Sequence, residues 1–97
     1  MAKKTAKAHA LANRPSLTPE LVRKIVVRGT PQSPADADPD VQLLTLGVVD
    51  SALAKDHKAA IQESLNGIGW HITQGDIDSA PATTVAECRD SVLDNAF

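Results

Sequence analysis

Few side chains in this sequence have both the type and the spacing that chemistry requires. The three histidines, His9, His57 and His71, form no HExxH-type pair and fall in three separate predicted segments. Cys88 is the only cysteine, which excludes an internal disulfide and a thiolate-rich zinc site. We therefore expect no bound metal.

Nucleophilic catalysis needs a nucleophile within reach of a base, and Ser51 with His57 is the pair to consider. At about 100° per residue the two side chains are about 240° apart around a helix, so they face different ways. The chain also contains no Gly-x-Ser-x-Gly elbow and no Gly-rich phosphate loop. We expect His57 to pack at the edge of the core and Cys88 to be a buried packing residue. The sequence thus indicates that the chain is not an enzyme.

The elements that must position these residues begin with a helix near the N-terminal third. Thr18 is suited to be an N-cap and Pro19 to be the first helical residue. The helix is expected to run to about Arg28 and to end before Gly29. The β-branched run 25–27 also suits a strand, which leaves an α+β fold as the alternative.

A second and stronger helix is expected directly after Asp50 and Ser51, in the segment that runs to Asn66. The segment 30–40 before it holds three prolines and three aspartates, which predicts a long surface loop. The apolar run 41–49 follows, and its periodicity does not distinguish a strand from a packed loop. The helix itself is rich in Ala, Lys, Gln and Leu without internal Gly or Pro. Asn66 and Gly67 are expected to end it in a left-handed C-cap.

The last third predicts a link, a helical turn and a final helix. Alternating apolar residues in 68–72 fit an extended link, and 73–78 fit one helical turn with Ile77 inward. Thr84 and Glu87 have capping-box spacing, which predicts the start of the last helix. Three main helices and one short turn indicate an all-α domain, a small bundle of three to four helices. The predicted core contains Leu21, Ile25, Leu53, Ile61, Leu65, Ile68, Val85 and Val92.

Length and charge limit the domain organisation. Ninety-seven residues, 42% of them hydrophobic, are enough for one small domain with a core. Residues 1–30 hold seven Lys or Arg against one acid, a net +6, whereas 31–97 hold three against eleven, a net −8. We expect a disordered basic tail over 1–15 and a single helical domain over 16–97. The tail could meet an acidic partner or, less favoured because it lacks aromatic residues, nucleic acid.

The same composition bears on location and assembly. No stretch approaches the roughly 18 to 20 apolar residues that span a bilayer, and the N-terminal lysines lead into no apolar run of signal-peptide length. A lone cysteine fits a reducing compartment. We expect a cytoplasmic monomer that has protein partners and does not insert into membranes.

The segment 46–53, Leu-Gly-Val-Val-Asp-Ser-Ala-Leu, resembles the attachment site of acyl carrier proteins. Those domains carry a Leu-Gly and then an Asp-Ser-Leu, whose serine begins the second helix and bears 4′-phosphopantetheine. The resemblance covers about 17–95, and Thr-Thr-Val at 83–85 matches a frequent opening of the family's last helix. It implies that Ser51 holds the cofactor with Asp50 beside it. A phosphodiester there would lie at the positive end of a helix dipole.

The sequence departs from the family's pattern near this serine. One extra residue separates Gly47 from Asp50, and Ala52 replaces the leucine after the serine. Lys55 and Lys58 balance the acids of a helix that is typically acidic in carriers. Two function classes stay open. One is a carrier-like domain that holds an acyl or peptidyl group for other enzymes. The other is a non-enzymatic helical interaction or regulatory protein, which could use its basic N-terminal arm to bind nucleic acid or an acidic partner and in which Ser51 is a plain N-cap.

Overall fold

A computed structural model describes residues 14–34 and 37–97, and all the regular elements in these ranges are helices. The helices are α2 (Pro19–Arg28), α3 (Ser51–Gly67), α4 (Gln74–Asp78) and α5 (Val85–Asn95). The described ranges contain no strand, and Gln42 and Thr84 form only an isolated antiparallel bridge. The predicted all-α bundle is confirmed over the α+β alternative.

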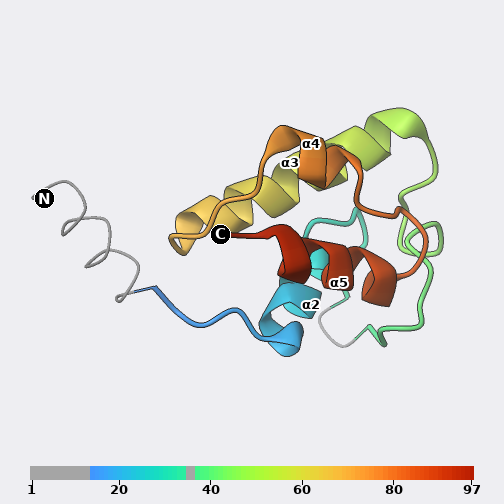
Figure 1. Cartoon of the computed structure of the whole chain (residues 1–97). Coiled ribbons are helices and arrows are strands. Elements are labelled where there is room, and N and C mark those ends of the chain that lie inside the picture. Colours follow the sequence, from blue (N-terminus) through green and yellow to red (C-terminus); the bar gives the residue numbers. More distant parts are fainter. Residues whose placement is uncertain (1–13, 35–36) are drawn as a thin grey trace, which may run out of the picture.

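The helices form two layers (Figure 1). The long α3 runs along one side with the short α4 beside it, and α2 and α5 lie together on the other side. The pairing of α2 with α5 is the most extensive contact between helices, and α3 also packs on α2. Helix α3 is therefore held in position by its contacts with α2, and its first residue, Ser51, is held in position with it.

Helix α2 begins and ends where its local sequence predicts. The Thr18 Oγ1 accepts a hydrogen bond from the Leu21 amide at 3.1 Å, and Pro19 takes the first helical position. The chain leaves the helix at Gly29, where an added Cβ would lie 3.0 Å from the His57 Cδ2. The glycine therefore allows α2 to approach α3 closely.

The apolar run 41–49 is a packed irregular segment, which settles a question that periodicity left open. The amides of 45–47 each bond to the carbonyl three residues before, as in helical turns. Leu43 and Leu46 are buried in the core. The Leu43 amide also donates to the Thr83 carbonyl at 2.8 Å, so the segment is tied to the chain just before α5.

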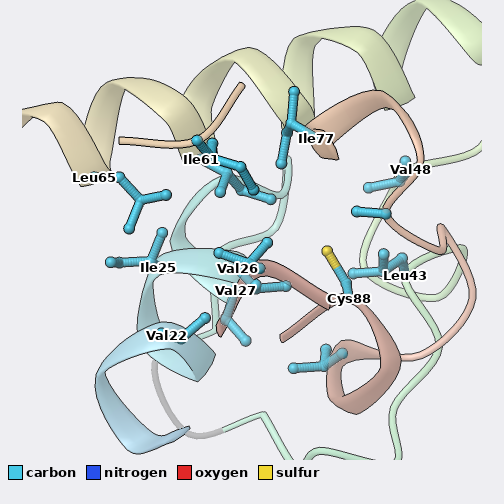
Figure 2. Close-up of a cluster of buried hydrophobic side chains, with 14 of the residues drawn as sticks. Val22, Ile25, Val26, Val27, Leu43, Val48, Ile61, Leu65, Ile77 and Cys88 are labelled. Carbon is cyan, nitrogen blue, oxygen red and sulfur yellow. The ribbon is translucent and has the colours of Figure 1, made fainter. Parts of the chain in front are cut away.

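One aliphatic core lies between the two layers (Figure 2). Five of the eight predicted core residues are buried, whereas Leu21 and Ile68 pack against the core partly exposed and Leu53 lies outside it. The consecutive buried residues 25–27 show that α2 is covered on more than one side, which a single apolar stripe does not predict. The core consists of Val22, Ile25, Val26, Val27, Leu43, Leu46, Val48, Ile61, Leu65, Ile72, Ile77, Ala80, Val85, Cys88 and Val92.

The end of α3 differs from the expected C-cap. Gly67 belongs to the helix, and the left-handed residue is Gly69, with φ +84°. The Trp70 amide bonds back to the Leu65 carbonyl at 2.9 Å, which is the outer bond of a Schellman closure. In that closure the left-handed residue directly precedes the one whose amide makes the outer bond, here Trp70. The glycine that ends the helix is therefore Gly69 and not the predicted Gly67.

The last two helices follow their predicted patterns closely. Ile77 in α4 is fully buried, as expected. At α5 the Thr84 Oγ1 accepts a hydrogen bond from the Glu87 amide at 3.1 Å, which is half of the predicted capping box. The other half differs, because the Glu87 Oε1 accepts from the Thr84 hydroxyl at 3.5 Å and no bond to the Thr84 amide accompanies it.

The predicted tail falls only partly within the described residues, and 1–13 lie outside them. Arg14 and Pro15 are described, and both contact Trp70. The Arg14 guanidinium carbon is 3.4 Å from the centroid of the indole ring, and the Trp70 Nε1 donates to the Pro15 carbonyl at 2.7 Å. Contacts of the domain therefore extend two residues beyond the predicted boundary at 16.

Candidate functional site

The start of α3 is capped by Asp50, and Ser51 is the first helical residue. The Asp50 Oδ1 accepts the Leu53 amide at 2.8 Å, and the Asp50 carbonyl accepts the Ala54 amide at 2.9 Å. The hypothesis that Ser51 is a plain N-cap is therefore wrong, because the preceding carboxylate takes that role. One oxygen of Asp50, a predicted cofactor-binding residue, is thereby committed to the helix end.

Because Asp50 caps the helix, the hydroxyl of Ser51 is not needed for capping. Ser51 is exposed, and its Oγ has no hydrogen-bond partner among the described residues. Because Asp50 satisfies the amides of Leu53 and Ala54, the amides of Ser51 and Ala52 are the donors left at the positive end of a 17-residue helix. Such a helix end favours a phosphate group attached to the hydroxyl.

The loop before Ser51 combines a strained glycine with exposed apolar side chains. Gly47 has φ +103°, and a Cβ there would lie 3.0 Å from the Pro31 Cβ, so only glycine fits without strain. Leu44 and Val49 in the same loop are 58% and 59% exposed. Sequence reasoning missed their exposure because an irregular segment has no periodicity that separates its inner from its outer side chains.

His57 is a structural contact between α3 and α2. It is buried, and its Nε2 donates to the Val26 carbonyl at 2.8 Å, since a carbonyl oxygen can only accept. Burial lowers the pKa of His57; the nearby charge of Lys58 acts in the same direction, and the bond to Val26 opposes it. Ser51 is exposed at the start of the helix, so the structure does not bring the two residues together as a catalytic pair.

The remaining residues considered for chemistry are also accounted for. Cys88 is buried in the core, as predicted, and burial raises the pKa of its thiol to about 11, so the thiol stays protonated at neutral pH. In the described part of the chain no three His, Cys, Asp or Glu side chains converge as metal ligands. Nor does any helix within 14–34 or 37–97 have the length and apolar character to cross a membrane.

A groove lies between α2 and the end of α3, at the opposite end of α3 from Ser51. It has a volume of about 320 Å³ and is lined by Leu21, Lys24, Ile25, Arg28, Ser64, Gly67 and Ile68. Sequence reasoning counted Lys24 and Arg28 only in the net charge. The available signal was their spacing of four residues beside Leu21 and Ile25, which puts two cations next to an apolar strip on one helix.

Comparisons with known proteins do not assign this chain to a family. No family model matches the chain, and the comparisons with curated proteins and with solved structures gave no match. The functional inference therefore depends on the Ser51 site and the groove themselves.

Proposed function

We propose that this protein is an acyl-carrier-like domain in which Ser51 carries 4′-phosphopantetheine. The observation that carries the proposal is the exposed hydroxyl of Ser51, which bonds to none of the described residues and lies at the first position of α3, directly after an aspartate that caps the helix. An aspartate followed by a serine at the start of the second helix is the feature on which the resemblance to carrier proteins depends.

The order and size of the helices support the same proposal. The 17-residue α3 follows the serine, the five-residue α4 comes next, and α5 opens at a Thr-Thr-Val sequence over 83–85. The resemblance implies this order of a second helix, a short third helix and a last helix. The irregular segment 41–49 then takes the place of the long loop that leads to the serine.

The residues at the helix end suit the attachment reaction. The Ser51 Oγ would attack the β-phosphorus of coenzyme A, with adenosine 3′,5′-bisphosphate as the leaving group. The hydroxyl proton would pass to a base of the transferase, since no described side chain accepts from Ser51. The amides of Ser51 and Ala52 are the donors available to the resulting phosphodiester. Once bound, the cofactor's thiol supplies a thioester link for an acyl or peptidyl group.

The surface beside Ser51 defines the kind of enzyme that this carrier would meet. The first turn of α3 contains no acidic residue after its cap, and Lys55 is exposed one turn along. Leu44 and Val49 are exposed in the loop that leads to the serine. The proposed partner enzymes would therefore recognise this carrier mainly through apolar contacts, with a smaller electrostatic contribution than an acidic carrier helix provides.

Loading with a phosphopantetheinyl transferase tests the proposal. The full chain is incubated with coenzyme A and a permissive transferase, and its intact mass is measured. We expect wild type to gain one phosphopantetheinyl group and Ser51→Ala to gain none. Ser79→Ala is the matched control: Ser79 is also exposed, but its hydroxyl is bonded to the Gly75 carbonyl at 2.8 Å, so this variant should load fully.

If wild type stays unloaded while a control carrier protein is converted, the carrier function is rejected. The function that then stands is a non-enzymatic helical interaction or regulatory protein. The groove between α2 and α3 favours this second candidate, because two exposed cationic side chains, Lys24 and Arg28, border an apolar floor that reaches the surface.

A further inference from the structure

The groove between α2 and α3 has an apolar floor. Ile25 is only 6% exposed, and Leu21 and Ile68 are half-buried against the core. Ser64 and Gly67 form the wall on the α3 side, where the glycine leaves open space because no atom lies within 4 Å of a Cβ placed there. The floor therefore extends from the core to the surface along about one turn of α2, from Leu21 to Ile25.

Two cations border this floor. Lys24 and Arg28 are both exposed and are one turn apart on α2, and they also line an adjoining hollow of about 170 Å³ that reaches Ser33. Neither is in an ion pair among the described residues, whereas Arg23 holds Glu20 at 2.7 Å. No carboxylate lines the groove. The groove itself is thus lined by two positive charges and by no negative one; Glu20, one turn before Lys24 on α2, is bonded to Arg23, and the Lys24 charge contributes to the lowered pKa of Glu20.

We propose that this groove binds an acidic amphipathic peptide segment of a partner protein. Aspartate or glutamate side chains of the segment would pair with Lys24 and Arg28, and its aliphatic side chains would cover Leu21, Ile25 and Ile68. Peptides with acidic and apolar residues on one face bind in this way to a groove of opposite charge. The inference does not depend on Ser51, because the groove lies about 20 Å or more from it at 1.5 Å per helical residue.

Two other occupants fit the groove less well. Nucleic acid binding relies on many phosphate contacts along a basic face, and this groove offers two cations around an apolar floor. A second copy of the chain would offer the acids of α5, which are exposed at Glu87, Asp90 and Asp94. Val85 and Val92 of that helix are buried and Leu93 is partly buried against the core, however, so α5 offers its acids with little apolar surface beside them.

Peptide selection followed by variants tests the assignment. A random peptide library displayed on phage is selected on the immobilised full chain, and the strongest peptide is measured by fluorescence anisotropy. We expect selected peptides to combine acidic and aliphatic residues. Lys24→Glu and Arg28→Glu should each weaken binding about tenfold, and added salt should weaken binding to wild type. Lys55→Glu is the control, because it makes the same charge change at an exposed residue of α3 outside the groove. It should leave the affinity for the peptide within about twofold of wild type.

Thermal melts of each variant separate lost binding from lost folding, and Lys24→Gln provides a milder change if Lys24→Glu unfolds. The proposal is overturned if no selected peptide responds to Lys24 or Arg28, or if Lys55→Glu weakens binding as much as they do. It is also overturned in favour of a second copy if the protein self-associates in sedimentation experiments and Lys24→Glu abolishes that association.

Discussion

At the residue scale, His57 completes the end of a helix to which it does not belong. The last four carbonyls of a helix have no partner within it, and in α2 these are the carbonyls of 25–28. All four accept hydrogen bonds, and the donors are Gly29, His57, Thr30 and Ser33. The His57 ring provides the only one of these bonds that comes from another helix. Its loss would leave the Val26 carbonyl buried and unsatisfied.

The burial of His57 makes the free energy of unfolding depend on pH. Because the pKa of His57 is lowered in the folded chain from its ordinary value of 6.5, the unfolded chain binds more protons between the two pKa values. The stabilisation is complete above the unfolded pKa and is lost as pH falls below about 6.5 toward the folded pKa. Urea unfolding measured across this range should show stability decreasing toward acid in wild type.

His57→Gln keeps a donor for the Val26 carbonyl and removes the titrating ring. We expect this variant to lose the pH dependence that belongs to His57, while any dependence from carboxylates at lower pH remains. Parallel pH profiles of wild type and His57→Gln would contradict the role of this buried ring.

At the element scale, two adjacent residues have different roles at the start of α3: Asp50 caps the helix, and Ser51 is its exposed first residue. Asp50 satisfies the helix end, and Ser51 contributes its exposed position without a hydrogen bond from its side chain. A carboxylate at an N-cap both accepts an amide and interacts favourably with the helix dipole. A serine free of that task can be modified without uncapping the helix.

The division of tasks predicts unequal effects on stability. Asp50→Ala should lower the free energy of unfolding by about 0.5 to 2 kcal/mol, because the Leu53 amide loses its acceptor. Ser51→Ala should change it by less than about 0.5 kcal/mol, since no bond of the side chain is lost. Urea denaturation of both variants gives the comparison. A larger loss in Ser51→Ala than in Asp50→Ala would place the cap on the serine after all.

At the scale of the whole molecule, both ends of the described chain meet the link between α3 and α4. Arg14 and Pro15 contact Trp70, and the backbones of His71 and Phe97 exchange two hydrogen bonds of 2.9 and 2.8 Å. These contacts join segments far apart in the sequence around a link that has no regular structure of its own. They explain why an extended link holds a defined position on a small bundle.

The contact of Arg14 with Trp70 predicts a fluorescence change, because Trp70 is the only tryptophan. Arg14→Ala should uncover the indole ring and shift its emission to longer wavelength, with a loss of stability of about 0.5 to 1 kcal/mol. Arg28→Ala removes an exposed arginine from α2 and should leave the emission unchanged. Identical spectra for wild type and Arg14→Ala would show that the guanidinium does not cover the ring in solution.

Sequence alone determined the helices and most of their starts, because a helix start depends on residues within one turn of each other. Thr18 with Pro19 and the Thr84 cap could be recognised from a few neighbours, and so could the long α3. The predicted core was correct where an apolar stripe faces one side, as at Ile61 and Leu65. The prediction that Ser51 begins a helix, and the resemblance built on it, needed no more than this local pattern.

Tertiary structure decided between arrangements that the local sequence allows equally well. Either Asp50 or Ser51 could cap α3 by residue type, and only the geometry of the incoming loop selects the aspartate. Six of the nine residues 41–49 are apolar, and the way this segment is tied to the chain just before α5 determines that Leu43 is buried and Leu44 exposed. The groove exists because α2 crosses α3 beside Lys24 and Arg28. Such features arise from contacts between residues distant in the chain, which no local window of sequence contains.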